Sequence, residues 1–206
     1  HARLGAIAAL QGDLERGREL QAAAEAMVPG EGESQRQVYL WRMFVEWQGG
    51  DRRSALARRT AIRQRHHPRR VDLVLQLLED MAAQPGETLV VGPSGAWFRV
   101  PNGEPVPVAN HKAVARILER LAHQAEVAPG QGCTMDDLVA AGWPGENLVP
   151  ESAKNRLFVA LARLRKLGLR DILQTVDEGW RLDPDWPTLL LQGDESDDDG
   201  AGYRVD

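Results

Sequence analysis

The chain has 206 residues, of which 43% are hydrophobic and 27% charged, and its formal net charge is −5, values typical of globular proteins. No run approaches the roughly 18 apolar residues of a membrane-spanning helix, and no segment resembles a signal peptide. These features exclude a membrane-embedded protein, and we expect a cytoplasmic protein that makes no contact with a membrane. Because the chain begins His-Ala-Arg rather than with Met, we expect further sequence upstream.

The cysteine content limits the kinds of site that the chain can form. Cys133 is the one cysteine, which excludes an internal disulfide and a zinc site built from several cysteines. We predict a buried structural thiol in a reducing compartment, and a reactive thiol is the alternative.

The negative charge is concentrated at the end of the chain. Residues 188–206 contain 6 acidic residues and 1 basic residue, whereas residues 1–87 and 88–187 are each near neutral. Acidic segments with few aromatic residues do not bury enough apolar surface to fold. We therefore predict an acidic, disordered tail over residues 188–206, and competition with DNA for a basic surface is an alternative role for it.

Residues 1–83 have the pattern of paired helices. Gly12-Asp13 and Gly50-Asp51 lie 38 residues apart, and each pair precedes a run with small or apolar residues seven positions apart. This spacing resembles tetratricopeptide repeats, whose helix pairs of about 34 residues pack through small side chains. The resemblance covers about the first 70 residues and implies that the segment receives a signal or a protein partner.

Two features of this helical segment have a structural and a functional interpretation. Apolar residues at helical spacing predict a buried face between the two units: Tyr39, Leu40, Met43, Phe44 and Trp47. An exposed aromatic box is the alternative. Residues 51–70 hold eight arginines, which we interpret as a solvated helix face; contact with nucleic acid or an acidic partner is the alternative. His66 and His67 would point about 100° apart on a helix, which is poor geometry for one metal ion.

The spacing of hydrophobic residues changes after residues 84–87, which we predict to be a linker. Short runs rich in valine and aromatic residues predict strands within residues 88–92, 96–101 and 104–109. Turn residues separate them, and Asn102-Gly103 is a hairpin signal. The segment Gly92-Pro-Ser-Gly lacks the Gly-Lys-Ser/Thr of a phosphate-binding loop, so we expect no nucleotide site.

Three helices and a hairpin are predicted next. The helices cover residues 111–126, 134–143 and 150–171, with Thr134 as an N-cap paired to Asp137 and with Pro150 in the first turn. Residues 172–184 predict two strands around a turn at Asp177 and Glu178.

Three motifs in this region resemble the winged helix-turn-helix domain of OmpR/PhoB-type transcriptional regulators. "ALARLRKLGL" (160–169) is similar to the recognition-helix core of that family, "TVDEGWRLDP" (175–184) to its wing, and "TMDDLVAAGWPGE" (134–146) to its supporting helix and turn. The resemblance covers residues 88–187. It implies an α+β fold: α-helical hairpin repeats, then a winged helix-turn-helix with a small N-terminal antiparallel sheet and a C-terminal β-hairpin wing.

Stepping 100° per residue divides the last helix into two faces. The core face holds Leu157, Ala160, Leu161, Leu164 and Leu167. The opposite face and its flanks hold the predicted DNA contacts of the helix, joined by one residue of the wing: Ser152, Lys154, Asn155, Val159, Arg163, Arg165 and Lys166, with Arg181. Arg163 suits a guanine, Asn155 an adenine and Val159 a thymine methyl group. Lys154, Arg165 and Lys166 suit phosphates, and Arg181 suits an adjacent groove or the DNA backbone.

A second function stays open. Phe158, Ala160 and Ala162 stand where the family usually carries charged or polar residues, and the acidic Asp177 and Glu178 would be repelled by phosphates at a wing tip. The alternative is a winged helix that has lost DNA binding and docks on protein, with Phe158 and Trp180 as anchors.

These patterns lead to one set of expectations. We predict a DNA-binding transcriptional regulator with double-stranded DNA and a protein as partners, the protein bound through the helical repeats. The domains would be residues 1–83, 88–187 and the tail 188–206, joined by the linker 84–87. The chain contains no nucleophile–base pattern, metal-ligand cluster or phosphate loop, so we expect no enzyme activity, no cofactor and no metal site.

Overall fold

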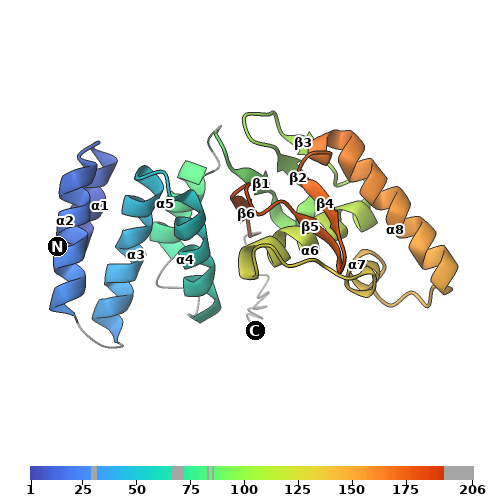
Figure 1. The fold of residues 1–206 in the computed structure, drawn as a ribbon, viewed down its shortest axis with the longest axis horizontal. Coiled ribbons are helices and arrows are strands. Elements are labelled where there is room, and N and C mark those ends of the chain that lie inside the picture. Colours follow the sequence, from blue (N-terminus) through green and yellow to red (C-terminus); the bar gives the residue numbers. More distant parts are fainter. Residues whose placement is uncertain (29–31, 66–71, 83, 85, 193–206) are drawn as a thin grey trace, which may run out of the picture.

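The computed structural model describes residues 1–28, 32–65, 72–82, 84 and 86–192. It shows an α+β protein in which five helices form one half, and a small sheet with three more helices and a hairpin forms the other (Figure 1). The predictions for His66 and His67 and for the acidic residues after Gln192 lie outside the described residues.

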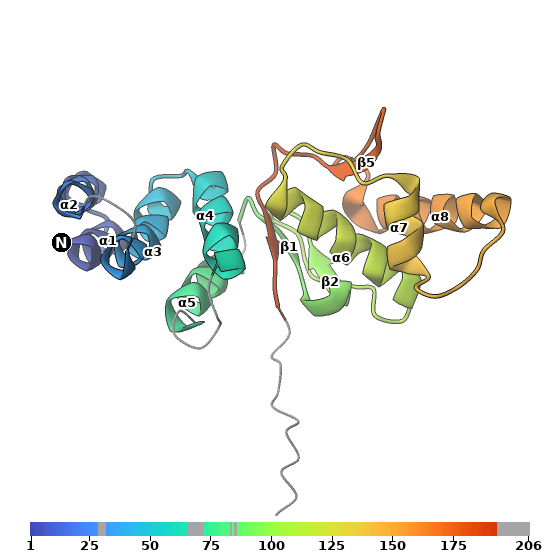
Figure 2. The same cartoon turned by 90° about the horizontal axis from the view of Figure 1, so that it is seen from below.

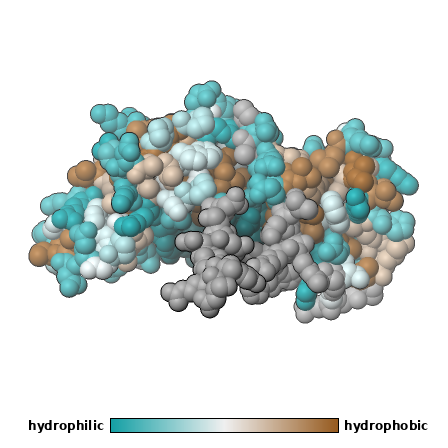
Figure 3. Space-filling model, turned by 180° about the vertical axis from the view of Figure 1, so that it is seen from behind, coloured by the Kyte–Doolittle hydropathy of each residue, from teal (hydrophilic) through white to brown (hydrophobic). Residues whose placement is uncertain are grey.

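The first half is a set of packed helices. Their bounds are α1 Ala2–Leu10, α2 Leu14–Met27, α3 Glu33–Gln48, α4 Arg52–Arg65 and α5 Asp72–Ala82. α1 packs against both α2 and α3, and α3 packs against α4. The surface of this half carries hydrophobic side chains at the end formed by α1 and α2 (Figure 3), where Leu4, Ile7 and Leu10 are exposed.

Small residues set the close packing of the first helix pair. A Cβ added at Gly5 would lie 2.8 Å from the carbonyl oxygen of Gly17, and a Cβ at Gly17 would lie 3.0 Å from the Cβ of Ala9. Any larger side chain at Gly5 would push α2 away from α1. Gly17 and Ala24, the small residues seven positions apart that follow the first Gly-Asp pair, are both buried.

The two Gly-Asp turns have the same geometry. Gly12 and Gly50 have positive φ angles of 93° and 84°, which glycine adopts without a steric cost. Asp13 and Asp51 each accept a hydrogen bond, 3.1 Å long, from the backbone N–H three residues later. Each aspartate thereby caps the helix that follows, α2 in one case and α4 in the other.

The buried face predicted for α3 is confirmed at its centre. Leu40, Met43 and Phe44 are buried and pack with Leu75 and Leu78 of α5, with Trp47 partly buried beside them. Tyr39 differs, because its ring lies at the surface beneath the Arg58 guanidinium, 5.2 Å from the ring centroid.

The sheet in the second half has four strands. They are β1 Leu89–Val91, β2 Trp97–Arg99, β3 Val106–Pro107 and β6 Thr188–Leu190, in the order β3-β2-β1-β6. The three predicted strands pair antiparallel, as expected, with Val91 opposite Phe98 and Phe98 opposite Val106.

The fourth strand corrects the predicted tail boundary. Residues 188–190 were assigned to the disordered tail, but β6 pairs in parallel with β1, Val90 opposite Leu189, and all three of its residues are buried. The apolar run Thr188–Leu191 is short, and the acidic residues after it dominated the composition of the segment. The prediction was therefore wrong at least for residues 188–190.

Three helices and a hairpin complete the second half. They are α6 Lys112–Val127, α7 Met135–Gly142, α8 Pro150–Leu164, β4 Leu173–Val176 and β5 Gly179–Leu182. The α7 N-cap is confirmed, because the Thr134 hydroxyl oxygen accepts the Asp137 N–H at 3.2 Å. The Asp137 carboxylate in turn accepts hydrogen bonds from the Thr134 hydroxyl (2.8 Å) and N–H (3.0 Å), and these two bonds lower the pKa of Asp137.

The last helix is shorter than predicted. α8 ends at Leu164 and continues as a π-helical turn over Arg165–Leu169, in which Gly168 has a φ of 126°. The regular helical geometry therefore ends at Gly168, whereas Lys166 and Leu167 keep the exposed and half-buried positions that the 100° step predicts.

A buried arginine joins the two halves. Arg59 of α4 is fully buried and donates hydrogen bonds to Glu79 of α5 (2.8 Å), Glu126 of α6 (2.9 Å) and the carbonyl oxygen of Leu190 in β6 (2.9 Å). Glu126 in turn accepts the Leu190 N–H at 2.8 Å, and Arg63 pairs with Glu79. Burial raises the pKa of Glu126, against the opposing effect of the Arg59 charge. Arg59 is therefore an exception to the solvated helix face predicted for residues 51–70, because it is buried and forms contacts across the protein.

The segment between the halves is held on both sides. The Gln84 carbonyl accepts a hydrogen bond from Arg99 (2.8 Å), the Gly86 carbonyl accepts one from the Asn102 N–H (2.8 Å), and Glu87 pairs with Arg52 (3.1 Å). The predicted linker therefore has fixed contacts with both halves. A small apolar cluster adds to the joint: Leu56, Ala82, Val90 and Leu189.

Removal of Arg59 tests the joint. Arg59→Ala leaves Glu79 and Glu126 buried without this cation, and we expect it to lower the free energy of unfolding by about 3–5 kcal/mol. Urea unfolding followed by circular dichroism measures the loss. Arg53→Ala is the control, because its ion pair with Asp185 is exposed and should contribute less than about 1 kcal/mol. Equal effects of the two substitutions would contradict the role of Arg59.

Candidate nucleic-acid interface

α8 lies at the edge of the molecule farthest from α1 and α2 (Figure 1). Its core face is as predicted, because Leu157, Ala160, Leu161 and Leu164 are buried and Leu167 is half-buried. The outer face is open to solvent along its length. The predicted contact residues found exposed on it are Ser152, Lys154, Asn155, Val159 and Arg163, and Lys166 is exposed on the π-helical turn that follows.

The core face fixes the direction of the outer face. Leu157, Leu161 and Leu164 belong to one buried cluster with Ile117 and Leu118 of α6. Each fully buried leucine contributes about 1.5–3 kcal/mol relative to an exposed one, so rotation of α8 about its axis would be costly. The exposed residues are consequently presented from a rigid support.

Two residues predicted to contact DNA form hydrogen bonds within the protein instead. Arg165 donates to the Leu173 carbonyl (3.2 Å) and to the Thr175 hydroxyl (2.9 Å), which ties the end of α8 to β4. Arg181 donates to the Gly130 carbonyl at 2.6 Å, which ties β5 to the loop after α6. Both side chains are half-buried, so their first role is to position the hairpin.

The two predicted aromatic anchors differ in exposure. Trp180 is only 8% exposed and belongs to the core, so it does not serve as a surface anchor. Phe158 is 45% exposed and meets Trp180 edge to face, with ring centroids 5.8 Å apart and an interplanar angle of 80°. Trp180 thus supports Phe158, which leaves Phe158 and the adjacent Val159 as exposed apolar groups on α8.

The β4–β5 hairpin projects from the helices (Figure 2). Asp177 and Glu178 form its turn and are exposed, as predicted. Behind the turn, Cys133 and Trp180 exchange backbone hydrogen bonds of 2.7 and 3.0 Å. A Cβ at Gly179 would lie 2.1 Å from the Cys133 carbonyl oxygen, so only glycine fits there.

Cys133 itself is a structural residue, as predicted. Its side chain is fully buried in the main core cluster. Burial raises the pKa of the Cys133 thiol, which disfavours the reactive thiolate form.

The charges on and around α8 are mixed. Residues 150–171 contain 6 basic and 2 acidic residues. Arg156 is paired with Glu146 at 2.9 Å, whereas Lys154, Arg163 and Lys166 form no ion pair within the part of the chain that the structure describes. The positive surface is therefore concentrated on the outer face of α8, with two carboxylates at the tip of the neighbouring hairpin.

Sequence reasoning missed two exposed residues at the ends of this surface. Val149 is 69% exposed and is the N-cap residue of α8, directly before Pro150. Arg170 is exposed after the π-helical turn. The glycine at position 168 was the available signal that the helix does not continue in regular steps.

No cofactor or metal site emerges from these residues. Over the described ranges, no group of three or more His, Cys, Asp or Glu side chains is arranged to hold a metal ion. Among the same residues, no helix combines the length and apolar character needed to cross a membrane. Comparison of the chain with protein-family models, with curated proteins and with solved structures gives no match.

The contact behind the hairpin turn is open to test. Gly179→Ala forces a Cβ against the Cys133 carbonyl at an unfavourable φ, and we expect a loss of unfolding free energy on the order of 3 kcal/mol. Gly145→Ala is the matched control, because Gly145 also has a positive φ but no atom within 4 Å of an added Cβ. It should cost about 1–2 kcal/mol from backbone conformation alone. Equal losses in urea unfolding would show that the close approach at Gly179 is unimportant.

Proposed function

We propose that the protein is a DNA-binding transcriptional regulator in which α6, α7, α8 and the β4–β5 hairpin act as a winged helix-turn-helix. The observation that carries this proposal is the outer face of α8, which is solvent-exposed, rigidly supported and lined by unpaired cations and by polar groups. The element order and the three motifs of residues 88–187 resemble OmpR/PhoB-type domains. In this proposal α8 enters the major groove, which is about 12 Å wide and admits one helix.

Each exposed residue of α8 has a role in the proposal. Arg163 pairs with guanine through two hydrogen bonds, Asn155 pairs with adenine, and Val159 contacts a thymine methyl group. Lys154 and Lys166 neutralise phosphates, which sets affinity and register rather than sequence preference. Arg165 and Arg181 hold the hairpin in place beside the helix.

The helical half supplies the regulatory input in this proposal. The Arg59 contacts and the apolar cluster join α4 to the sheet and to α6. A protein or small molecule that binds α1–α5 therefore binds a group of helices that is in direct contact with the DNA-binding half.

Selection from a random-sequence duplex pool at two salt concentrations tests DNA binding. We expect an enriched motif whose affinity falls with salt, and Lys154→Ala with Lys166→Ala should reduce the slope of log K against log salt by about 2. The control is Arg16→Ala with Arg53→Ala, which removes the same charge from exposed positions outside α8. Absence of retention by the folded wild-type chain at low salt would rule out the proposal.

Arg163 has a separate prediction because it is assigned to a base. Arg163→Ala should weaken binding to the selected motif by about 1–3 kcal/mol and relax the preference at one base pair. Competition binding against a panel of single-base variants measures both quantities. If affinity and preference are both unchanged, Arg163 does not read a base.

A second function is favoured by the apolar part of the same surface. Val149, Phe158 and Val159 are exposed on or next to α8, and the hairpin tip is acidic. These features suit a docking surface for a protein. Under this alternative the chain retains no duplex from the pool, and Phe158→Ala weakens a protein complex without changing the fold.

A further inference from the structure

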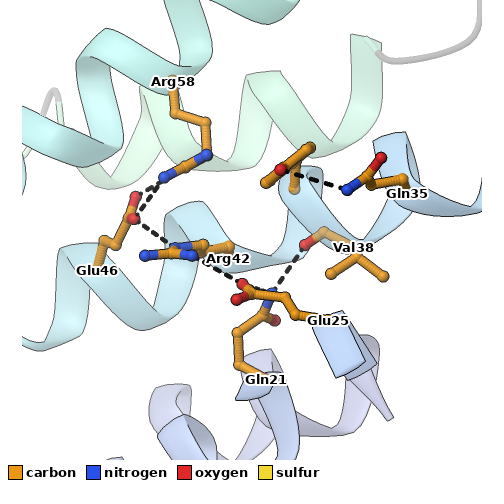
Figure 4. Close-up of polar contacts among 8 residues, drawn as sticks. Gln21, Glu25, Gln35, Val38, Arg42, Glu46 and Arg58 are labelled. Atoms are coloured by element: carbon orange, nitrogen blue, oxygen red, sulfur yellow. Dashed lines mark hydrogen bonds and ion pairs between the residues drawn. The ribbon is translucent and has the colours of Figure 1, made fainter. Parts of the chain in front are cut away.

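A polar cavity of about 280 Å³ lies between α2 and α3. Residues at helical spacing on the two facing sides line it, together with the turn that follows α3. They are Arg18, Gln21, Ala22 and Glu25 from α2, and Arg42, Val45, Glu46, Gly49 and Asp51 from α3 and the turn. Part of this lining is drawn in Figure 4, where side chains of α2 and α3 point toward one another.

The inner wall of the cavity is an electrostatically balanced network. Arg42 pairs with Glu25 (2.8 Å) and with Glu46 (2.7 Å), and Arg58 pairs with Glu46 (2.8 Å) (Figure 4). The Gln21 amide nitrogen donates to Glu25 at 3.0 Å. Two carboxylates and two guanidinium groups thus satisfy each other and leave no net charge for a ligand to neutralise.

Two other charges on the cavity have no ionic partner. Arg18 and Asp51 are exposed, and neither forms an ion pair with any residue that the structure describes. Asp51 accepts only a backbone hydrogen bond from Ser54, through one oxygen. The end of the Arg18 side chain lies over Gly49, since a Cβ added at Gly49 would lie 3.1 Å from its Nη2. One cation and one carboxylate therefore border the same cavity, unpaired with each other.

A third group of the lining lacks a partner. Gln21 is 95% buried, given a relative exposure of 5%, and its Oε1 has no hydrogen bond. A buried acceptor without a donor costs about 1–3 kcal/mol. This atom has less than 1 Å² of accessible surface, so the ionic contacts that the cavity offers a ligand are those of Arg18 and Asp51.

We propose that the cavity between α2 and α3 is a binding site for a small zwitterion of the α-amino-acid class. The ligand carboxylate pairs with Arg18, and the ammonium group pairs with Asp51. Arginine is suited to carboxylates because its donors match both oxygens. The volume limits the ligand to a small molecule, since larger organic ligands occupy pockets of roughly 300–1,000 Å³.

This site stands apart from the proposed DNA interface. α8 contributes no residue to the cavity, and the binding assay below contains no DNA. Failure of DNA binding therefore leaves the proposal intact, and failure of amino-acid binding leaves the DNA proposal intact.

Isothermal titration calorimetry of the full chain with each standard L-amino acid tests the proposal. We expect saturable binding of at least one amino acid below roughly 10 mM, the range of a few charge-assisted contacts. Acetate and methylammonium, which carry one charge each, should bind at least about tenfold more weakly, because each makes only one of the two ionic contacts.

Two substitutions remove the charges while keeping the fold. Arg18→Gln changes an exposed side chain, and Asp51→Asn retains the helix cap because asparagine caps as well as aspartate. Each should weaken binding at least about tenfold. Arg16→Gln and Asp13→Asn are matched controls, an exposed arginine of α2 and its N-cap, both outside the cavity, and should bind like the wild type.

Three results would overturn the proposal. The first is the absence of binding by every amino acid to the folded chain. The second is binding of acetate or methylammonium as tight as that of the best amino acid. The third is a loss in the control variants that equals the loss in Arg18→Gln and Asp51→Asn.

Discussion

The structure depends on the burial of one guanidinium group. β6 is the outermost strand of the sheet, and the backbone N–H and carbonyl of Leu190 would be unpaired at its open edge. Glu126 accepts that N–H and Arg59 donates to that carbonyl. An ion pair between α4 and α6 thus completes the hydrogen bonding of the edge strand, and Glu79 supplies a second carboxylate to the same arginine. Loss of one partner from such a buried pair leaves the other as an uncompensated charge, which is the main cost of breaking it.

The arrangement of the two halves follows from this joint. α4 lies against the sheet, α3 packs on α4, and α1 and α2 follow outward, while α8 lies on the far side of α6 (Figure 1). The cavity between α2 and α3 and the exposed face of α8 are consequently at opposite ends of one connected body. α4, through its contacts with Glu126 and β6, is part of the structure that connects them.

Local signals in the sequence predicted most elements and few long-range contacts. The helices and most strands followed from apolar periodicity, and the α7 cap followed from Thr134 and Asp137, because these features act within a few residues. The burial of Arg59 could not be read from its segment, since its partners lie 20, 67 and 131 residues away. Arg165 and Arg181 were assigned to DNA for the same reason: their carbonyl acceptors come from another element or loop. The exposed face of α8, by contrast, needed only the 100° step and was predicted correctly up to Leu164.

The parallel pairing of β6 with β1 also governs the order of events during synthesis. Residue 89 leaves the ribosome 99 residues before residue 188, its partner in the sheet. Until β6 arrives, β1 has an unpaired edge beside the buried Val90, and Arg59 lacks the Leu190 carbonyl. A pairing of such long sequence separation forms slowly, and an open apolar strand edge favours association with other chains. The nascent protein is therefore most exposed to aggregation in the interval before its last described strand is made.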